Sequence, residues 1–441
     1  MSSTDFMQAG EDNLRHIAVI GAGYVGLPTA AILSHRGHFV AIAERDGARL
    51  EMLRQGASPI AESGLDEMLQ EGIRTGHLRA VATAAEAVSG AEFVFLCVET
   101  PQAKDGSADL SFIIGAATEI AEYLTDGAII VNKSTVPLGT VKLVEQVIGR
   151  ADVSVVSNPE FLREGSAIAD SLSPDRVVVG AQNRDIATRV ANLFSVTGAP
   201  VVITDATTSE LIKYASNAFL ATKLTFINTM ARLCEAVDAN VSDLVFGIGH
   251  DKRIGFDFLQ PGPGWGGSCL PKDTSALLAI AESVGFDIEI VRAAISGNEN
   301  QMNCVVDKIR IATGGTLDGR CIGVLGLTFK ANTGDRRDSP AISITSRLVA
   351  KGATVRAFDP TVRRDSADAL DLSHIEVFDD PYEALTGTHG IALLTEWPEF
   401  RDLDFERIRQ CVTTPTIVDA RNLLAAGPLR ELGFSYTGIG R

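Results

Sequence analysis

The sequence is poor in cysteine, in aromatic residues and in basic residues. Its 441 residues include 6 cysteines and 6% aromatic residues, and 39 Lys and Arg stand against 56 Asp and Glu, a formal net charge of −17. The cysteines form no Cys-x-x-Cys pair and the 7 histidines lack ligand spacing, which argues against a disulfide framework or a metal site. Too little basic charge is present for nonspecific binding to nucleic acid or anionic membranes. We therefore expect no metal, no nucleic acid partner and no membrane partner.

Long apolar runs are also missing. No uninterrupted run reaches the roughly 18 residues of a membrane span. The first sixteen residues are polar and lack the apolar core of a signal peptide. The 45% hydrophobic and 22% charged residues are typical of a globular chain, and the length suggests two to four domains at roughly 100–200 residues each. We expect a cytoplasmic protein.

The chain opens on a strand, a glycine-rich turn, a helix and a second strand. The apolar run His16–Ile20 leads into Gly21-Ala-Gly-Tyr-Val-Gly26, and a second apolar run at 39–43 ends at Glu44. Alternation of strand-like and helix-like stretches predicts a parallel sheet covered by helices. The further strand-like runs lie at 93–98, 128–131, 153–156 and 176–179.

A long helix and a second copy of the opening pattern follow. Residues 207 to about 237 carry apolar residues at helical spacing without Gly or Pro, so this helix could join two domains or two subunits. The run 320–326 echoes 15–21, and 352–359 echoes 37–44. We predict an α/β protein of two Rossmann-like, doubly wound domains joined by a long central helix and a helical segment. The expected boundaries are 1–203, 204–300 and 301–441.

The three glycines of the first turn have dinucleotide-binding spacing. Gly21 allows the tight turn, Gly23 lets a pyrophosphate approach the backbone, and Gly26 lets helix and strand pack closely. Glu44, at the end of the second strand, can accept hydrogen bonds from ribose hydroxyls and would repel a 2′-phosphate. The pattern favours NAD over NADP, although Arg45 weakens that discrimination.

Cys269 is a candidate nucleophile. It lies in Gly266-Gly-Ser-Cys-Leu-Pro-Lys-Asp273, where glycines allow close approach by a ligand and Lys272 could favour a thiolate. Asp273 could orient a water molecule or accept a proton. The alternative is a buried cysteine that only packs. A nucleophilic cysteine beside a nicotinamide site suggests aldehyde oxidation through a thioester.

Three further patterns leave two interpretations open. Glu160 and Glu164 share one face if their segment is helical, and either supply a general base or begin a solvated helix. Lys213 and Asn217 are also four residues apart; Lys213 is a snorkelling surface residue by default, or an acid or oxyanion stabiliser if it faces the Cys269 loop. The basic run 328–340 either binds phosphate or is a solvated loop.

Together these motifs resemble the UDP-glucose/GDP-mannose dehydrogenase family, from about Arg15 to the C-terminus. The resemblance implies an N-terminal NAD domain, a C-terminal UDP-sugar domain and a central helix that mediates dimerisation. It implies oxidation of a C6 alcohol to a carboxylate with two NAD, through a Cys269 thiohemiacetal and thioester. The matching blocks are Gly21-Ala-Gly-Tyr-Val-Gly-Leu-Pro28, Asp105-Gly-Ser-Ala-Asp109, Lys133-Ser-Thr-Val-Pro137, Ser157-Asn-Pro-Glu-Phe-Leu-Arg-Glu-Gly165, Gly264-Trp-Gly-Gly-Ser-Cys-Leu-Pro-Lys-Asp273 and Phe329-Lys330 with Arg337.

The resemblance also implies roles for individual residues. The catalytic set would be Cys269, Lys213, Asn217, Asp273, Glu160 and Thr135. The NAD-binding set would be Gly21, Gly23, Tyr24, Val25, Gly26, Glu44, Arg49, Thr100, Thr135, Glu164, Lys272 and Arg337. The nucleotide-sugar set would be Glu160, Phe161, Leu162, Glu164, Lys213, Asn217, Arg253, Phe258, Gly266, Lys330 and Arg421, with Arg253 reaching the sugar of a partner subunit in a homodimer or higher oligomer.

Details of the motifs narrow the substrate and leave rivals. Gly-Gly-Ser-Cys, the Lys330 loop and Thr395-Glu-Trp397 favour the UDP-glucose branch over UDP-N-acetylhexosamine members, which typically carry Gly-Gly-His-Cys. Glu99 and Trp265 depart from the family pattern, near the nicotinamide and the sugar respectively. The rivals are another nucleotide-sugar dehydrogenase such as a GDP-mannose enzyme, a two-electron hydroxyacid or sugar-phosphate dehydrogenase, and a non-catalytic NAD sensor.

The acidic composition must be reconciled with anionic ligands. Five basic residues fall inside the proposed ligand motifs, although the chain as a whole is acidic. We expect these five to line a positive cleft in a negative protein. They are Lys213, Arg253, Lys272, Lys330 and Arg337.

Overall fold

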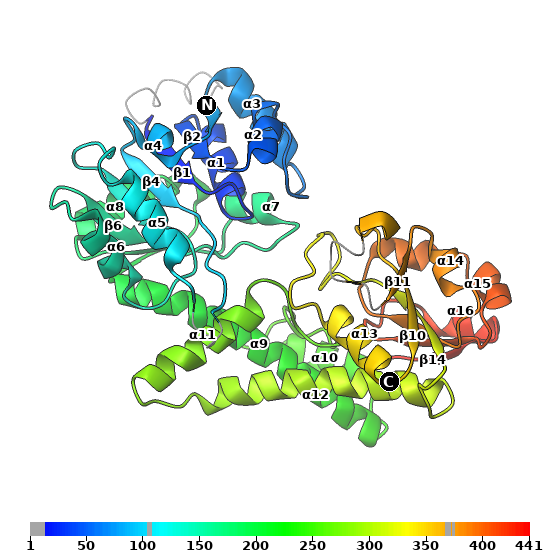
Figure 1. Ribbon diagram of the computed structural model, residues 1–441. Helices are drawn as coiled ribbons and strands as arrows, with labels where there is room; N and C mark the ends of the chain where they lie inside the picture. Colours follow the sequence, from blue (N-terminus) through cyan, green and yellow to red (C-terminus); the bar gives the residue numbers. More distant parts are fainter. Residues whose placement is uncertain (1–13, 104–107, 367–371, 373–374) are drawn as a thin grey trace, which may run out of the picture. The chain divides into compact units, whose positions relative to one another are not determined.

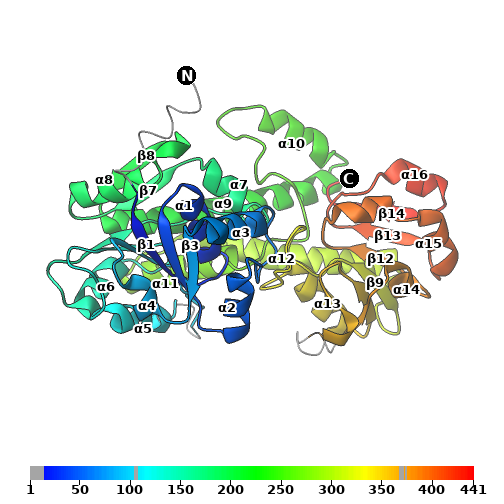
Figure 2. The same cartoon turned by 90° about the horizontal axis from the view of Figure 1, so that it is seen from above.

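The computed structural model describes residues 14–103, 108–366, 372 and 375–441, so residues 105–107 of the Asp105 block lie outside it. The chain divides into two compact units, Met1–Ala215 and Ser216–Arg441. Each unit contains one twisted sheet with helices on both faces, as Figures 1 and 2 show. This confirms the α/β class with two Rossmann-like domains.

The first unit contains an eight-stranded sheet in the order β3-β2-β1-β4-β5-β6-β7-β8. Both faces are buried, because alternate β1 residues enter different cores: Ile17 and Val19 face α1, α3, α7 and α8, whereas Ala18 and Ile20 face α4, α5 and α6. The strands are β1 His16–Ile20, β2 Phe39–Ala43, β3 Leu78–Val81, β4 Phe93–Leu96, β5 Ile129–Asn132, β6 Ser154–Ser157, β7 Val177–Gly180 and β8 Val201–Thr204.

Helices fill the connections of the first unit. They are α1 Gly26–His35, α2 Gly47–Arg54, α3 Leu65–Thr75, α4 Ala84–Val88, α5 Ser111–Ile120, α6 Thr140–Ile148, α7 Ala167–Leu172 and α8 Arg184–Asn192, with a 3-10 turn at Ser195–Thr197. The alternating pattern predicts a sheet that is parallel throughout, and this prediction is wrong at one strand pair. β7 pairs antiparallel with β6 at Ser157 and Gly180, and β8 runs parallel to β7. Only one residue pair joins β7 to β6, whereas four residue pairs join β7 to β8.

The second unit repeats the strand order of the first six strands. Its sheet is β11-β10-β9-β12-β13-β14, with every pair parallel. The strands are β9 Cys321–Leu325, β10 Thr354–Phe358, β11 Glu376–Phe378, β12 Ile391–Leu393, β13 Thr416–Asp419 and β14 Ser435–Thr437. The helices that follow them are α13 Pro340–Ala350, α14 Pro381–Leu385, α15 Phe405–Cys411 and α16 Ala426–Glu431, with 3-10 turns at Arg364–Ser366 and Pro398–Asp402.

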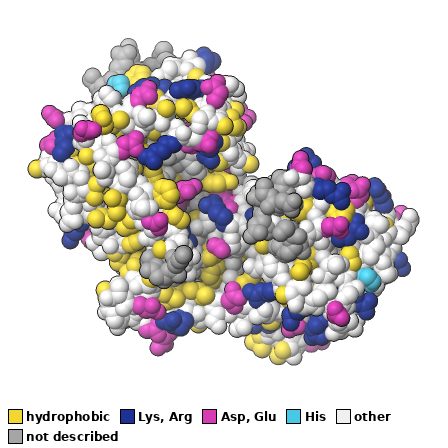
Figure 3. Space-filling model, viewed as in Figure 1, with side chains coloured by type: hydrophobic (Ala, Val, Ile, Leu, Met, Phe, Trp, Pro, Cys, Tyr) yellow, Lys and Arg dark blue, Asp and Glu magenta, His cyan; other side chains and the backbone are white. Residues whose placement is uncertain are grey.

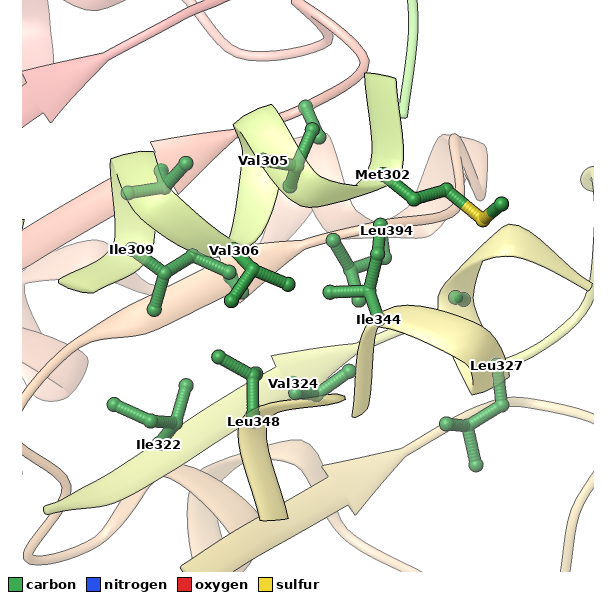
Figure 4. Packing of buried hydrophobic residues seen from close by; sticks show 14 of the residues in the cluster. Met302, Val305, Val306, Ile309, Ile322, Val324, Leu327, Ile344, Leu348 and Leu394 are labelled. Atoms are coloured by element: carbon green, nitrogen blue, oxygen red, sulfur yellow. The ribbon is translucent and has the colours of Figure 1, made fainter. Parts of the chain in front are cut away.

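Four helices connect the two sheets along the chain. They are α9 Ala206–Ala236, α10 Val241–Gly249, α11 Leu270–Ser283 and α12 Glu289–Ala312. At about 1.5 Å per residue, the 31 residues of α9 extend about 46 Å, and the division between the two units falls inside this helix. Figure 4 shows how α12 packs on the second sheet: Val305 and Ile309 lie over the same core as Ile344, Leu348 and the strand residue Val324. Within the described residues, no helix is long and apolar enough to cross a membrane.

Candidate active site

The glycine-rich turn between β1 and α1 has the geometry of a pyrophosphate cradle. Gly21 has φ +100°, and a Cβ there would lie 2.7 Å from the carbonyl oxygen of Cys97. A Cβ on Gly26 would lie 1.8 Å from the carbonyl oxygen of Gly21, so helix and turn could not pack. A Cβ on Gly23 would meet no described atom within 4 Å, which leaves the space that a phosphate needs. Tyr24 and Val25 complete the turn, Val25 as the residue before α1.

Substitution of the two glycines should separate folding from cofactor binding. We expect Gly26→Ala to lower the melting temperature of the cofactor-free protein, because its methyl group collides with backbone. We expect Gly23→Ala to leave the melting temperature unchanged and to weaken NAD binding at least tenfold, about 1.4 kcal/mol. Calorimetry and titration of both variants with NAD provide the measurement. Equal effects on folding from both substitutions would contradict the assignment of the turn.

Glu44 and Arg49 form a polar pair beside this turn. Glu44 directly follows β2, and its Oε2 accepts a hydrogen bond from Arg49 Nε at 3.1 Å. Arg49 also donates to the carbonyl oxygen of Ala22 at 2.6 Å, inside the glycine-rich turn. Arg45 instead pairs with Glu119 on α5. The basic residue that pairs with Glu44 is therefore Arg49, and Arg45 has its own carboxylate partner.

The loops after β4 and β5 contact each other. Thr100 Oγ1 donates to the carbonyl oxygen of Thr135 at 2.8 Å, and Ser134 Oγ donates to that of Val98 at 2.6 Å. Carboxyl ends of parallel strands form the ligand-binding edge of such a sheet. Thr100 and Thr135 lie at this edge, and their contact with NAD stays a prediction. Glu99 is exposed, so this departure from the family pattern does not fill the protein interior.

A buried ion pair joins β6 to α9. Lys213 Nζ donates to Glu160 Oε1 at 2.7 Å, and only 4% and 6% of the two side chains are exposed. Glu160 Oε2 accepts from the backbone N–H of Leu162 at 2.6 Å. Burial alone raises the pKa of Glu160, but Lys213, the hydrogen bonds and the more distant Lys133 bring it below the ordinary value. Glu160 is therefore held as a buried carboxylate.

Two local interpretations of the sequence are wrong here. Residues 158–165 form no helix, so Glu160 and Glu164 do not share a helical face; Pro159 and the turn at 164–165 interrupt the chain before α7. Lys213 does not snorkel at the surface, because it is buried against Glu160. The rest of this segment stays close to the pair: the Phe161 ring lies 3.6 Å from the Arg176 guanidinium and 5.5 Å from Lys213 Nζ.

Two residues that no motif argument singled out support this loop. Lys133, after β5, is buried and donates to Asn158 Oδ1 at 3.1 Å. Burial lowers the pKa of Lys133, while Cys97 and Glu160 oppose that shift. Glu62 accepts from the backbone N–H groups of Gly165 and Ala167 at 2.8 and 2.7 Å and so caps α7. Lys133 lies inside a block quoted above, whereas Glu62 has no sequence signal.

The second unit holds the cysteine loop and a second polar cluster. Cys269 is half-buried and directly precedes α11, where the helix dipole favours negative charge. Ser268 Oγ lies 3.5 Å from Cys269 Sγ. One turn along α11, buried Asp273 accepts from Asn217 Nδ2 at 2.5 Å and from Lys272 Nζ at 2.6 Å. Asn217 thus positions the helix that begins at the cysteine.

The remaining substrate candidates occupy loops of the second unit. Arg337 pairs with Asp335 through two hydrogen bonds of 2.9 and 2.8 Å, and Lys330 Nζ lies 5.4 Å from the Phe329 ring. Arg421 donates to the carbonyl oxygens of Leu394 and Phe329 at 2.9 and 2.7 Å. Arg421 therefore holds the Lys330 loop in place through the backbone of Phe329.

Two further candidates follow α10, and a third lies in the cysteine loop. Arg253 is 88% exposed and pairs with Asp251 at 2.5 Å, and Phe258 has φ +60°. Gly266 packs so closely on the loop after β9 that a Cβ would lie 2.0 Å from the carbonyl oxygen of Asp338. Trp265 is buried, and its indole N–H donates to Thr225 Oγ1 at 2.9 Å, so this family departure anchors the loop.

In the second unit, Asp359 occupies the position that matches Glu44 and is bonded to the turn after β9. Asp359 follows β10, as Glu44 follows β2, but its Oδ2 accepts from the backbone N–H groups of Leu327 and Thr328 at 2.7 and 3.1 Å. The same oxygen accepts from Trp397 Nε1 at 3.2 Å. Asp359 is therefore occupied in holding the turn after β9, and the second copy is built for a different ligand.

The basic residues of the predicted positive cleft are mostly paired with carboxylates. The partners are Glu160 for Lys213, Asp251 for Arg253, Asp273 for Lys272 and Asp335 for Arg337. Figure 3 likewise shows basic and acidic side chains interspersed on the face in view. The five residues belong to both units, and their convergence on one cleft stays a prediction.

Both units match models of one enzyme family. The UDP-glucose/GDP-mannose dehydrogenase models match residues 15–197 for the NAD-binding domain, 207–300 for the central domain and 323–426 for the UDP-binding domain. The chain therefore belongs to the UDP-glucose/GDP-mannose dehydrogenase family.

Relatives and solved structures agree with this family. A UDP-glucose 6-dehydrogenase of Rhizobium meliloti (strain 1021) is 43% identical over 435 residues, 96% of this chain and 99% of that protein. One from Pseudomonas aeruginosa is 41% identical over 444 residues, 96% and 97% of the two chains. A UDP-glucose dehydrogenase from Pyrobaculum islandicum superposes with a TM-score of 0.90 at 34% identity over 98% and 99% of the chains, and a UDP-D-ManNAc dehydrogenase from Pyrococcus horikoshii with 0.85 at 28% over 96% and 99%.

Proposed function

We propose that this protein oxidises UDP-glucose to UDP-glucuronate, a four-electron oxidation that consumes two NAD. The observation that carries the proposal is the pair of polar clusters on α9: Lys213 is paired with Glu160, and Asn217, one helical turn later, with Asp273. An ammonium and an amide at this spacing can stabilise the oxyanions of carbonyl chemistry. Glycines 21, 23 and 26, together with Glu44, would hold NAD, which supplies the hydride acceptor when bound.

The first half of the proposed reaction converts the C6 alcohol to an aldehyde. The hydroxyl proton would pass to solvent water while Lys213 stabilises the developing alkoxide, and the hydride would go to bound NAD. The Cys269 thiol then adds to the aldehyde: the sulfur–carbon bond forms, and the carbonyl oxygen gains the proton that sulfur loses. Asn217 and Lys213 bind that oxygen, so the thiohemiacetal stays on the enzyme.

The second half converts the thiohemiacetal to a carboxylate. Loss of a second hydride, which a second NAD would accept, and of the hydroxyl proton to water gives a thioester; water then breaks its carbon–sulfur bond and restores the thiol. Glu160, kept as a carboxylate, takes the proton from water, with Thr135 and Asp273 orienting the attacking molecule. Glu164, Lys272 and Arg337 would contact NAD. Phe161, Leu162, Phe258, Gly266, Lys330 and Arg421 would shape the nucleotide-sugar site.

A panel of nucleotide sugars tests the choice of substrate. We expect kcat/KM for UDP-glucose to exceed that for GDP-mannose and for UDP-N-acetylmannosamine by at least about 100-fold, roughly 2.7 kcal/mol of transition-state discrimination. The Gly-Gly-Ser-Cys sequence supports this order. A higher kcat/KM for GDP-mannose or for UDP-N-acetylmannosamine would contradict the choice of UDP-glucose and identify that sugar as the substrate. Absence of NADH formation with every sugar would instead revive the non-catalytic NAD sensor.

We further propose that the protein is a homodimer formed through α9. Phe219, Phe226, Leu233 and Val237 form an exposed apolar stripe with nearly helical spacing. A stripe of this kind normally packs on another surface, and a second copy of α9 presents the same residues. In such a dimer Arg253 would reach the partner's sugar.

A charge on the stripe tests the dimer. We expect Phe226→Lys to convert dimers to monomers in light scattering after gel filtration, because the lysine would have to be desolvated in the interface. Phe112→Lys on α5, an equally exposed phenylalanine, should leave the mass unchanged. A wild-type monomer, or a dimer that survives Phe226→Lys, would contradict this interface. A cytoplasmic location also stays a proposal; the six free cysteines suit a reducing compartment.

A further inference from the structure

The loop that leads to Cys269 is held by side-chain amides of two neighbouring helices. Residues 261–268 form no helix or strand, and Gly264 and Gly267 have φ values of +137° and +86°. A loop without its own hydrogen-bond ladder needs other partners for its buried backbone groups. α9 and α12 supply them.

Asn298 on α12 binds both sides of one loop residue. Its Oδ1 accepts from the backbone N–H of Trp265 at 2.8 Å, and its Nδ2 donates to the carbonyl oxygen of Trp265 at 2.9 Å. The side chain is 7% exposed. The approach is tight, since a Cβ on Gly264 would lie 2.8 Å from the same Oδ1. This two-point contact fixes both the place and the orientation of residue 265.

A second amide on the same helix holds the start of the loop. Gln301 Nε2 donates to the carbonyl oxygen of Gly262 at 2.7 Å, and Asn228 Oδ1 on α9 accepts from the N–H of Gly262 at 2.8 Å. Asn298 and Gln301 are buried beside apolar α12 residues such as Met302. Buried amides cost free energy unless they are hydrogen-bonded. Both ends of the Asn298 amide bind the loop, whereas Gln301 binds it through Nε2 alone and its Oε1 has no hydrogen-bond partner among the described residues.

The contact between Asn298 and Trp265 restricts the position of Cys269, because the chain between Trp265 and Cys269 is short and tightly packed. Three residues separate Trp265 from Cys269, and within that interval Gly267 N donates to the carbonyl oxygen of Arg337 at 3.1 Å. Gly266 has no room to shift toward Asp338. Beyond the cysteine, α11 is fixed by the Asn217–Asp273 hydrogen bond. The direction of Cys269 is therefore set from one side by Asn298 and from the other by Asn217.

We propose that Asn298 and Gln301 are positioning residues for Cys269, required when the thiol adds to the aldehyde and dispensable when the alcohol is oxidised. This inference rests on the proposed function, because it assigns the two amides to one half of that reaction. The first oxidation forms no bond to sulfur, so a small shift of the Cys269 thiol leaves it intact. The second requires the sulfur within bonding reach of C6, which depends on the geometry of the loop.

Asn298→Asp is the sharpest test. The change keeps size and acceptor but removes the hydrogen bond to the Trp265 carbonyl and places two oxygens against each other. We expect oxidation of the supplied UDP-sugar C6 aldehyde to fall about 30-fold, roughly 2 kcal/mol, and alkylation of Cys269 by iodoacetamide, followed by peptide mapping, to slow at least fivefold. Formation of trapped aldehyde from UDP-glucose should stay within threefold of wild type. Asn300→Asp, an exposed amide on the same helix, is the matched control.

The outcomes separate positioning from general damage. Equal losses in both half-reactions, or unchanged alkylation of Cys269, would overturn the proposal. If Asn298→Asp fails to fold, Gln301→Leu removes the hydrogen bond to Gly262 without adding a charge and takes the same three measurements with the same expected direction. The alkylation rate needs no sugar, so it decides the positioning role even if wild-type protein oxidises no nucleotide sugar, a result that would defeat the proposed function alone.

Discussion

Cys269→Ser is expected to lower net formation of uronate at least roughly 1,000-fold, about 4 kcal/mol of transition-state free energy. A serine hydroxyl has nearly the size of the thiol but is far less nucleophilic without a strong base, so the aldehyde is no longer captured. Oxidation of the alcohol does not involve sulfur and should continue. The expected products are therefore one NADH and an aldehyde for each sugar that reacts.

Cys411→Ser provides the control for the cysteine experiment. Cys411 is half-buried at the end of α15, where its thiol donates to the carbonyl oxygen of Ile408, a hydrogen bond that a serine hydroxyl can also make. This variant should retain wild-type activity. Full turnover of Cys269→Ser to the carboxylate would show that no covalent intermediate forms and would favour a hydroxyacid-type dehydrogenase.

Lys213→Met is expected to destabilise the protein by about 3–5 kcal/mol, because it leaves the Glu160 carboxylate buried without its partner. Activity should be lost as well, since the ammonium is the proposed oxyanion donor. The double variant Lys213→Met/Glu160→Gln removes both charges and should recover most of the stability but none of the activity. Denaturant unfolding of wild type, Lys213→Met, Glu160→Gln and the double variant completes a double-mutant cycle.

The pH dependence of this pair has opposite signs in wild type and variant. In wild type the pKa of Glu160 is lowered, so its contribution to stability is present above the unfolded value near 4.5 and is lost as pH falls through the folded value. Without Lys213, burial dominates and raises the pKa of Glu160 above that of the unfolded chain. The variant should then lose stability as pH rises.

Melting temperatures across pH check this reversal. The wild-type melting temperature should rise as pH increases up to about 4.5 and then level off, whereas that of Lys213→Met should fall as pH increases above about 4.5. Arg74→Met breaks an exposed pair with Glu71 and should follow the wild-type curve. Parallel curves for wild type and Lys213→Met would show that the pair does not hold Glu160 ionised.

Much of the fold could be predicted because its signals are local. The runs 16–20 and 39–43 became strands with those bounds, and the helix expected at 207–237 runs from Ala206 to Ala236. The echo at 320–326 and 352–359 predicted a second sheet, and its strand order repeats that of the first. The antiparallel direction of β7 was not predicted. The direction of a strand depends on the path of the connection before it, and the hydrophobic pattern of the strand carries no information about that path.

The site was less predictable because its contacts join distant residues. Glu160 and Lys213 are 53 positions apart, so neither the acidic spacing at 160 and 164 nor the helical setting of Lys213 revealed the pair. The same reason applies to two other contacts, Asn217 with Asp273 and Trp265 with Asn298, whose partners are 56 and 33 positions apart. Glycine roles were predictable, because each depends on a turn only a few residues long.

The most direct test of the central claim is the amount of NADH formed when a limiting quantity of UDP-glucose is exhausted with excess NAD. Two NADH and one UDP-glucuronate per UDP-glucose are the result we expect from wild-type protein, with no free aldehyde detected. One NADH per sugar, with aldehyde or ketone as the final product, would contradict a four-electron oxidation through Cys269.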